Sequence, residues 1–340
     1  MAVRRPLPAY LAASIPAAAR SAQGLPALKR AVVTGPTGGV GVNLINELTA
    51  HGVAVYAVHR PDSPRVGNLP VHPLVTAVPC ALDSFPALPE RIDVPCDAFF
   101  HLAWDGAYGA ARNDASLQQR NVGAALDAVR AADALGCAVF VGAGSQSEFG
   151  RVSGVLSPDL PCRPDTEYGK AKLAACKQSS ALCGARGLRH SWCRILSLYG
   201  PFDGAHTMVM ALISQLLAGK RPQCTAGEQI WDYIYAKDAA RAFRLVAERG
   251  RPGAVYCVGS GKPRLLKDYI RAIRDAIDPA LPVGFGELPY YPHQVMRLEA
   301  DITSLTADTG FAPQYSFEAG IGETVAWMRA RMAETGDSPT

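Results

Sequence analysis

The sequence predicts an α/β fold, with a doubly wound parallel sheet followed by a smaller α/β domain. From Lys29 onward, apolar runs typical of buried strands alternate with segments that have the apolar spacing of helices. This alternation is typical of parallel sheets covered by helices on both faces. A glycine-rich turn, AVVTGPTGGVG at residues 31–41, joins the first strand to the first helix. After Pro201 the alternation becomes less regular, which marks a second domain.

The first turn has the spacing of a dinucleotide-binding loop. Gly35 permits a tight turn out of the strand, Gly38 lets a pyrophosphate approach the backbone, and Gly41 lets the helix pack close to the sheet. The phosphates would lie at the helix N-terminus, where free N–H groups and the helix dipole favour negative charge. An ordinary glycine-rich βα turn is the alternative, but the next strand, Val53–Val58, completes a βαβ unit. We therefore predict a Rossmann-type domain over residues 29–200.

The other elements follow in order along the chain. Further strands of the first domain are expected at Val75–Val78, Ala98–Leu102, Ala138–Ala143 and Arg189–Ile195. Its helices are expected at Asn113–Leu135 and Tyr168–Cys183, each ended by the glycine that follows. A mainly substrate-binding domain over 201–332 is predicted to hold Met208–Ala218, Tyr233–Tyr235, Lys237–Arg249, Val255–Val258, Leu265–Ile277 and Phe317–Met332. Some of its segments are expected to return to the first sheet.

Composition excludes several classes of protein. The 340 residues are 49% hydrophobic and 19% charged, as in globular enzymes, and the net charge of +4 is too small to indicate nucleic acid or a membrane surface as partner. Nine cysteines without a CxxC pair argue against a zinc site and a disulfide framework, so we expect no metal and a reducing, cytoplasmic location. Residues 1–28, rich in Ala and Pro, are predicted to be a loosely ordered arm rather than a signal peptide, and 333–340 a tail.

The end of the second strand bears on the choice of cofactor. An acidic residue at this place binds the ribose of NAD, whereas an arginine accommodates the 2′-phosphate of NADP. Here the strand ends in VHRPDS, so Arg60 lies at the tip and Asp62 follows slightly later. This order favours NADP, with NAD as the alternative.

Two short segments carry candidate catalytic groups. Tyr168 and Lys172 are four residues apart on a predicted helix, so both lie on one face, where a cation would favour the phenolate form of the tyrosine. Ser145 follows the strand Ala138–Ala143, at the edge of the sheet where ligands bind. Alone, each residue has an ordinary structural interpretation; together behind a dinucleotide turn they predict proton transfer at a substrate oxygen.

These residues make the chain, over roughly 29–332, resemble the extended short-chain dehydrogenase/reductase family, the NAD-dependent epimerase/dehydratase type that acts largely on nucleotide sugars. The matching segments are TGPTGGVG at 34–41, HLA at 101–103, Ser145 before Phe149-Gly150, YGKAK at 168–172, YGP at 199–201, WDYIYAKD at 231–238, CVGSG at 257–261 and 301–313. The resemblance implies cofactor contacts from Gly35, Thr37, Gly38, Gly39, Val40, Gly41, Arg60, Leu102, Ala103, Trp104, Asn121, Tyr168 and Lys172. It implies substrate contacts from Trp104, Ser145, Gln146, Ser147, Tyr168 and Arg297, a nucleotide-sugar substrate, and a homodimer through Asn113–Leu135 and Tyr168–Cys183.

Three reactions are common in such a site. Sugar 4,6-dehydratases carry an acid/base carboxylate pair directly after the catalytic residue, and here those places hold Gln146 and Ser147, while Glu148 comes one residue late and is expected to face elsewhere. An epimerase with tightly bound NAD and an NADPH-dependent ketoreductase remain as alternatives. Arg60 favours reduction of a nucleotide-linked 4-keto-6-deoxy sugar, with Tyr168 as proton donor. A regulator that senses NAD(P) without turnover is less favoured, because both Tyr168 and Lys172 are present.

One departure from the resemblance concerns the substrate diphosphate. Relatives often carry arginine in a pattern like LPYRP, whereas this chain has LPYYP at 288–292, with Tyr291 at the place of the arginine. Arg297, six residues further on, is the candidate replacement. Without it, diphosphate binding is weaker or the substrate is not a standard nucleotide sugar.

Overall fold

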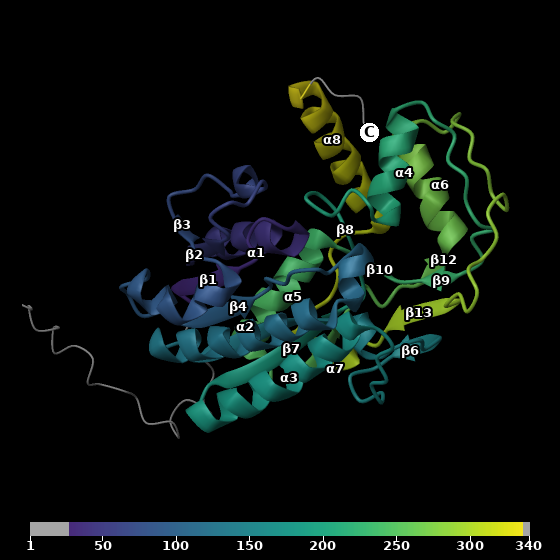
Figure 1. Ribbon diagram of the computed structural model, residues 1–340. Helices are drawn as coiled ribbons and strands as arrows, with labels where there is room; N and C mark the ends of the chain where they lie inside the picture. The colour runs from purple at the N-terminus through teal and green to yellow at the C-terminus, as the bar shows by residue number, and fades with distance from the viewer. Residues whose placement is uncertain (1–26, 336–340) are drawn as a thin grey trace, which may run out of the picture.

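A seven-stranded sheet forms the centre of the protein, in a computed structural model that describes residues 27–335 (Figure 1). The strand order is β11-β7-β5-β4-β1-β2-β3, and all its pairs are parallel. The strands are β1 (Arg30–Thr34), β2 (Ala54–His59), β3 (Val75–Pro79), β4 (Ala98–His101), β5 (Val139–Ser145), β7 (Arg189–Ile195) and β11 (Val255–Val258). The predicted doubly wound parallel sheet is confirmed, and β11 is a late segment that returns to it.

Helices cover both faces of this sheet. Helices α1 (Gly39–Ala50), α5 (Ala236–Arg249) and α7 (Thr303–Thr309) pack on one face, and α2 (Ala115–Ala134) and α3 (Glu167–Arg186) lie on the other, with the 3₁₀ helix η4 (Leu82–Glu90) beside α2. Alternation along the strands explains the two cores: Val33 and Phe100 belong to the first, and their neighbours Val32 and Phe99 to the second. Both faces of each central strand are therefore apolar, as parallel sheets require.

A smaller layer of structure lies beyond the carboxyl ends of the sheet strands (Figure 1). Its four-stranded sheet has the order β12-β9-β13-β6, and β8 pairs with β10 in a second, two-stranded sheet. The strands are β6 (Gly154–Leu156), β8 (Ser197–Tyr199), β9 (Ile230–Trp231), β10 (Tyr233–Tyr235), β12 (Arg264–Leu265) and β13 (Arg297–Ala300). Helices α4 (Met208–Leu217), α6 (Leu266–Ile277) and α8 (Phe317–Thr335) share a separate apolar core. The division near residue 200 and the homodimer stay predictions.

Several element ends differ from those expected. Helix α3 does not stop at Gly184 but runs to Arg186, because the left-handed residue that ends it is Gly187, with φ of 69°. Helix α2 begins at Ala115, since the Asp114 side chain accepts the amide of Leu117 and caps the helix there. Helix α8 continues to Thr335, beyond the expected end at Met332. The predicted arm lies outside the described residues up to position 26, and Leu28 is already buried in the core.

Candidate active site

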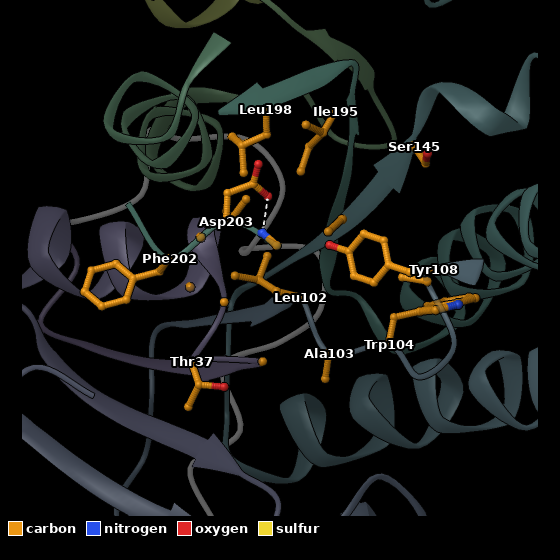
Figure 2. A pocket seen from close by; sticks show the side chains of 18 of the residues that line it. Thr37, Leu102, Ala103, Trp104, Tyr108, Ser145, Ile195, Leu198, Phe202 and Asp203 are labelled. Carbon is orange, nitrogen blue, oxygen red and sulfur yellow. Dashed lines mark hydrogen bonds between the residues drawn. The ribbon is translucent and has the colours of Figure 1, made fainter. Parts of the chain in front are cut away.

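A cavity of about 560 Å³ lies at the carboxyl ends of β1, β2, β4, β5 and β7, between the large sheet and the smaller layer. Figure 2 shows its walls: Thr37, Leu102 and Ala103 come from the ends of β1 and β4, and Leu198, Phe202 and Asp203 from the segment that leads into α4. Trp104 and Tyr108 form another wall, from the segment after β4. The cavity therefore lies where the sequence placed the ligand, at the edge of the parallel sheet.

The glycine turn leaves open space for a ligand beside the backbone. Gly35 has φ of 67°, and a Cβ there would lie 2.8 Å from the Ala103 nitrogen. A Cβ at Gly41 would lie 2.2 Å from the Gly35 carbonyl oxygen, so the start of α1 has room only for glycine. At Gly38 the nearest atom is 4.0 Å away. The turn is thus close-packed at Gly35 and Gly41 and has free space at Gly38, which fits the pyrophosphate of a dinucleotide.

Arg60 lines the cavity at the end of β2, together with Ser63 and Arg65. Its guanidinium lies 3.6 Å from a carboxylate oxygen of Asp105, and both side chains are about half exposed. Sequence reasoning missed Asp105, because this residue follows β4 and meets Arg60 only in the folded chain. A carboxylate therefore does lie beside the arginine expected to bind a 2′-phosphate.

Ser145 and Tyr168 both line the cavity. Ser145 is the last residue of β5, and its hydroxyl accepts the Ser147 amide at 3.2 Å, at the start of the 3₁₀ helix η6 (Gln146–Glu148). Tyr168 lies in the first turn of α3. Burial raises the pKa of Tyr168 to about 12, while hydrogen bonding with Ser145 and the charge of Arg112 lower it. The two predicted residues are therefore brought together, with a tyrosine that holds its proton firmly.

Lys172 has partners other than the tyrosine hydroxyl. Its ammonium donates to the Ala143 carbonyl at 2.8 Å and lies 3.7 Å from the centre of the Trp104 ring. The centre of the Tyr168 ring is 5.9 Å away. Burial lowers the pKa of Lys172 to about 7, against a smaller opposing effect of Glu148. The expected face shared by the tyrosine and lysine is present, and the ammonium is directed at the strand end.

Arg112 was missed by the sequence reasoning. It belongs to the 3₁₀ helix η5 (Gly109–Asn113) and lines the cavity. Its guanidinium carbon lies 4.5 Å from the centre of the Tyr168 ring, and its Nη2 donates to the Ser147 hydroxyl at 2.8 Å. Nothing in the local pattern around 112 marks it, since the contact depends on how the segment after β4 folds back over α3.

Glu148 faces away from the cavity, as expected. Its side chain is fully buried, and its Oε1 accepts the Ser145 amide and the Trp192 indole N–H, both at 2.9 Å. Its Oε2 accepts from Arg194 Nε at 2.8 Å. Glu148 and Ser145 form a capping box, in which each side chain reaches the backbone of the other end of the turn. The carboxylate is thereby held behind the serine.

The remaining predicted residues separate into two groups. Gln146 and Ser147 line the cavity, and the buried Gln146 Oε1 has no hydrogen-bond partner among residues 27–335. Asn121 is buried and does not line the cavity: its side chain bonds the backbone N–H and carbonyl of Asp105. Arg297 also lies outside the lining, on β13, where it is paired with Glu299 at 2.8 Å.

Comparison with known proteins identifies the family. The model of the NAD dependent epimerase/dehydratase family matches residues 31–259, which include the glycine turn, Ser145, Tyr168 and Lys172. The chain belongs to this family. The resemblance to extended short-chain dehydrogenases/reductases is thus confirmed.

Individual proteins that are similar to this chain are 21–28% identical to it. A dTDP-glucose 4,6-dehydratase of Xanthomonas campestris is 28% identical over 184 residues, which is 52% of each chain, so the match spans about half the length of that enzyme. A UDP-N-acetylglucosamine 4-epimerase of Methanobrevibacter ruminantium has a similar fold, with a TM-score of 0.80, 24% identity, and coverage of 89% of this chain and 99% of the other. The protein RMD of Pseudomonas aeruginosa, solved with NADPH, has a TM-score of 0.72, 21% identity, and coverage of 89% and 100%.

The described residues lack two other kinds of feature. Within residues 27–335, no group of His, Cys, Asp and Glu side chains has an arrangement that would hold a metal ion. In the same part of the chain, no helix combines the length and the apolar character needed to cross a bilayer.

Proposed function

We propose that this family member is an NADPH-dependent ketoreductase that acts on a nucleotide-linked 4-keto sugar, with a 6-deoxy sugar as the predicted substrate. One observation carries the choice against dehydration. The two positions after Ser145 hold the uncharged Gln146 and Ser147, and the carboxylate of Glu148 is buried against Arg194. No acid is therefore available at the places from which a dehydratase moves protons at C5 and C6.

The proposed cofactor is NADPH, with NAD as the alternative. Arg60, Arg65 and Ser63 supply a cationic, hydrogen-bonding edge to the cavity at the end of β2, which suits a 2′-phosphate. Proteins of similar fold have been solved with NADPH, as RMD was, and with NAD, as a dTDP-glucose 4,6-dehydratase of Bacillus anthracis was, so the proposal rests on this edge of the cavity. Binding requires Arg60 to exchange Asp105 for the phosphate, and the exposure of both side chains makes this exchange inexpensive.

The residues of this chain would divide the chemistry as follows. Bound NADPH would supply the hydride. Ser145 would hold the substrate oxygen by a hydrogen bond, and Tyr168 would donate its proton to that oxygen as negative charge develops there. Lys172 and Trp104 would lie against the nicotinamide half of the cofactor, and Gln146, which lines the cavity, would face the sugar.

The test of the cofactor uses three variants. Arg60→Ala should weaken NADPH binding by about tenfold or more and leave NADH binding unchanged, because one charge-assisted contact to phosphate is lost. Asp105→Asn should tighten NADPH binding, since it removes the competing carboxylate. Asp62→Asn, at the neighbouring exposed carboxylate, is the control and should change the affinity for neither NADPH nor NADH. Equal affinity of the wild-type protein for the two cofactors contradicts the proposal.

The second candidate function is a 4-epimerase with tightly bound NAD. It is favoured by the fold shared with the UDP-N-acetylglucosamine 4-epimerase and by a site that both reactions can use. An epimerase keeps its oxidised cofactor throughout the cycle, whereas a reductase releases NADP⁺ after each turnover. We expect purified protein to carry little NAD⁺ and to consume one NADPH per keto sugar reduced. A full complement of NAD⁺ with interconversion of two epimers, without added reductant, would establish the epimerase.

A further inference from the structure

Tyr168 must become an anion whenever it gives up a proton, and the protein has to stabilise that anion inside a buried site. In the proposed reduction, the hydride and its electron pair reach the carbonyl carbon, the O–H bond of Tyr168 breaks, and a new O–H bond forms on the substrate oxygen. The tyrosine is left as a phenolate until water returns its proton. Burial of Tyr168 disfavours this charged form strongly.

Four charged or titratable groups lie near the Tyr168 ring, and Arg112 is the closer of the two cations among them. Glu148 and Tyr108 disfavour the phenolate, because each carries or acquires negative charge. Lys172 is bonded to the Ala143 carbonyl and lies over Trp104, and its ammonium is 5.9 Å from the centre of the Tyr168 ring. Arg112 lies 4.5 Å from the centre of the ring, and a guanidinium is the side-chain cation best suited to stacking on an aromatic face.

The position of Arg112 is fixed by the protein. Its guanidinium carbon lies 4.5 Å from the centre of the tyrosine ring, and two of its N–H groups donate to the Ser147 hydroxyl at 2.8 Å and the Ala107 carbonyl at 3.3 Å. Both acceptors are uncharged, so these bonds hold the guanidinium without neutralising it. A cation against the face of an aromatic ring is attracted by the ring and, more strongly, by a phenolate.

We propose that Arg112 is a positioning residue that acts through Tyr168: its guanidinium stabilises the phenolate left when the tyrosine donates its proton, and Ser147 holds it in place. The proposal rests on the proposed role of Tyr168 as proton donor. It also assigns a role to Ser147, which occupies the sequence position at which a dehydratase has a catalytic carboxylate. In this chain the hydroxyl at that place anchors a cation.

The test reads the ionisation of Tyr168 without any substrate. Tyr168 is replaced by 3,5-difluorotyrosine, whose hydroxyl is more acidic because fluorine withdraws electrons, and its pKa is measured by ¹⁹F NMR titration. In Arg112→Gln the pKa should rise by about one to two units, the effect of removing an opposite charge at this range. Arg112→Lys should give a smaller rise, because the charge is kept and the planar contact is lost. Arg120→Gln removes an exposed cation of α2 and should leave the pKa unchanged.

A titration of Arg112→Gln that coincides with the wild-type titration overturns the proposal, whatever happens to turnover. If Arg112→Gln loses its folded circular dichroism spectrum, the pKa at position 168 is measured in Arg112→Lys and Ser147→Ala instead. A pKa that rises in neither of these two variants also overturns the proposal. With a competent substrate, proton-limited turnover of Arg112→Gln should fall by about tenfold, the factor that one pKa unit represents. Failure of ketoreduction would refute the proposed function and leave the titration valid.

Discussion

The buried ion pair of Glu148 and Arg194 predicts a large effect on stability. The side chains are 0% and 5% exposed, and the carboxylate accepts hydrogen bonds from Ser145, Trp192 and Arg194. Glu148→Gln keeps one oxygen for the serine amide but places an NH₂ group against Arg194 Nε, so that two donors face each other. The guanidinium is then a buried charge without its counter-ion.

Removing one partner of a buried ion pair costs about 3–5 kcal/mol of unfolding free energy. For a chain of this size, that corresponds to a fall in Tm of roughly 4–7 °C. The assay is chemical denaturation followed by tryptophan fluorescence, with calorimetry for Tm. The control is Asp165→Asn, which breaks the pair of Asp165 with Arg151 at 2.6 Å, where the side chains are 38% and 65% exposed. Such a surface pair is worth about 0–1 kcal/mol.

A double variant separates stability from catalysis. Glu148→Met with Arg194→Met removes both charges and fills similar volume, so it should be more stable than Glu148→Gln alone. Its turnover should fall below that of Glu148→Gln, because the Ser145 amide has lost the acceptor that holds the serine in place. A stability of Glu148→Gln within 1 kcal/mol of the wild type, a margin typical of surface pairs, would refute the reasoning.

Three further predictions concern the site and the core. Tyr168→Phe keeps the ring and removes the proton donor, so turnover should fall by about 10²–10⁴ in steady-state kinetics while calorimetric cofactor binding and Tm are kept; near-normal turnover would exclude the proposed chemistry. Gly41→Ala places a Cβ 2.2 Å from the Gly35 oxygen and should abolish tight cofactor binding in calorimetry. The matched control is Gly184→Ala, where a Cβ would meet no atom within 4 Å, and it should raise the free energy of unfolding by about 0.5–1 kcal/mol. Burial lowers the pKa of His101 to about 3, so the unfolded chain binds more protons below the ordinary histidine pKa of about 6.5. The free energy of unfolding should therefore fall as the pH drops, by about 2 kcal/mol at pH 5. Chemical denaturation at pH 7 and pH 5 should show a smaller difference in His101→Asn, and an equal difference would contradict the assignment.

The sequence predicted the elements well where the signal was local. Strands and helices of the large sheet were found from their apolar spacing, because a strand buried on both faces and an amphipathic helix each leave a pattern within a few residues. The predicted end of α3 was wrong because the local sequence does not decide where this helix stops. Two glycines, Gly184 and Gly187, were available as C-caps, and only the folded backbone shows which of them adopts positive φ.

The site was predictable only where a motif carries it. The glycine turn, Ser145, Tyr168 and Lys172 are placed in the cavity as the sequence indicated. Arg112 and Asp105 were not foreseen, because their partners Tyr168 and Arg60 are 45 or more residues away along the chain. Both contacts depend on the path of the segment after β4. Arg297 was chosen by its distance along the chain from Tyr291, and the fold instead pairs its half-exposed side chain with Glu299 on β13.

One turn of 3₁₀ helix explains why a carboxylate so near Ser145 takes no part in the proposed proton transfer. Ser145 is the N-cap of this turn, and Glu148 at its third helical position returns its side chain to the Ser145 backbone. The capping box uses this return: Glu148 accepts the Ser145 amide, and Arg194 and Trp192 complete its shell inside the core. Gln146 and Ser147, one and two places after the serine, face the cavity instead. A carboxylate at either of those places would reach a bound sugar, whereas the same group one residue later is held by the backbone, so register within the turn decides which proton chemistry the site can perform.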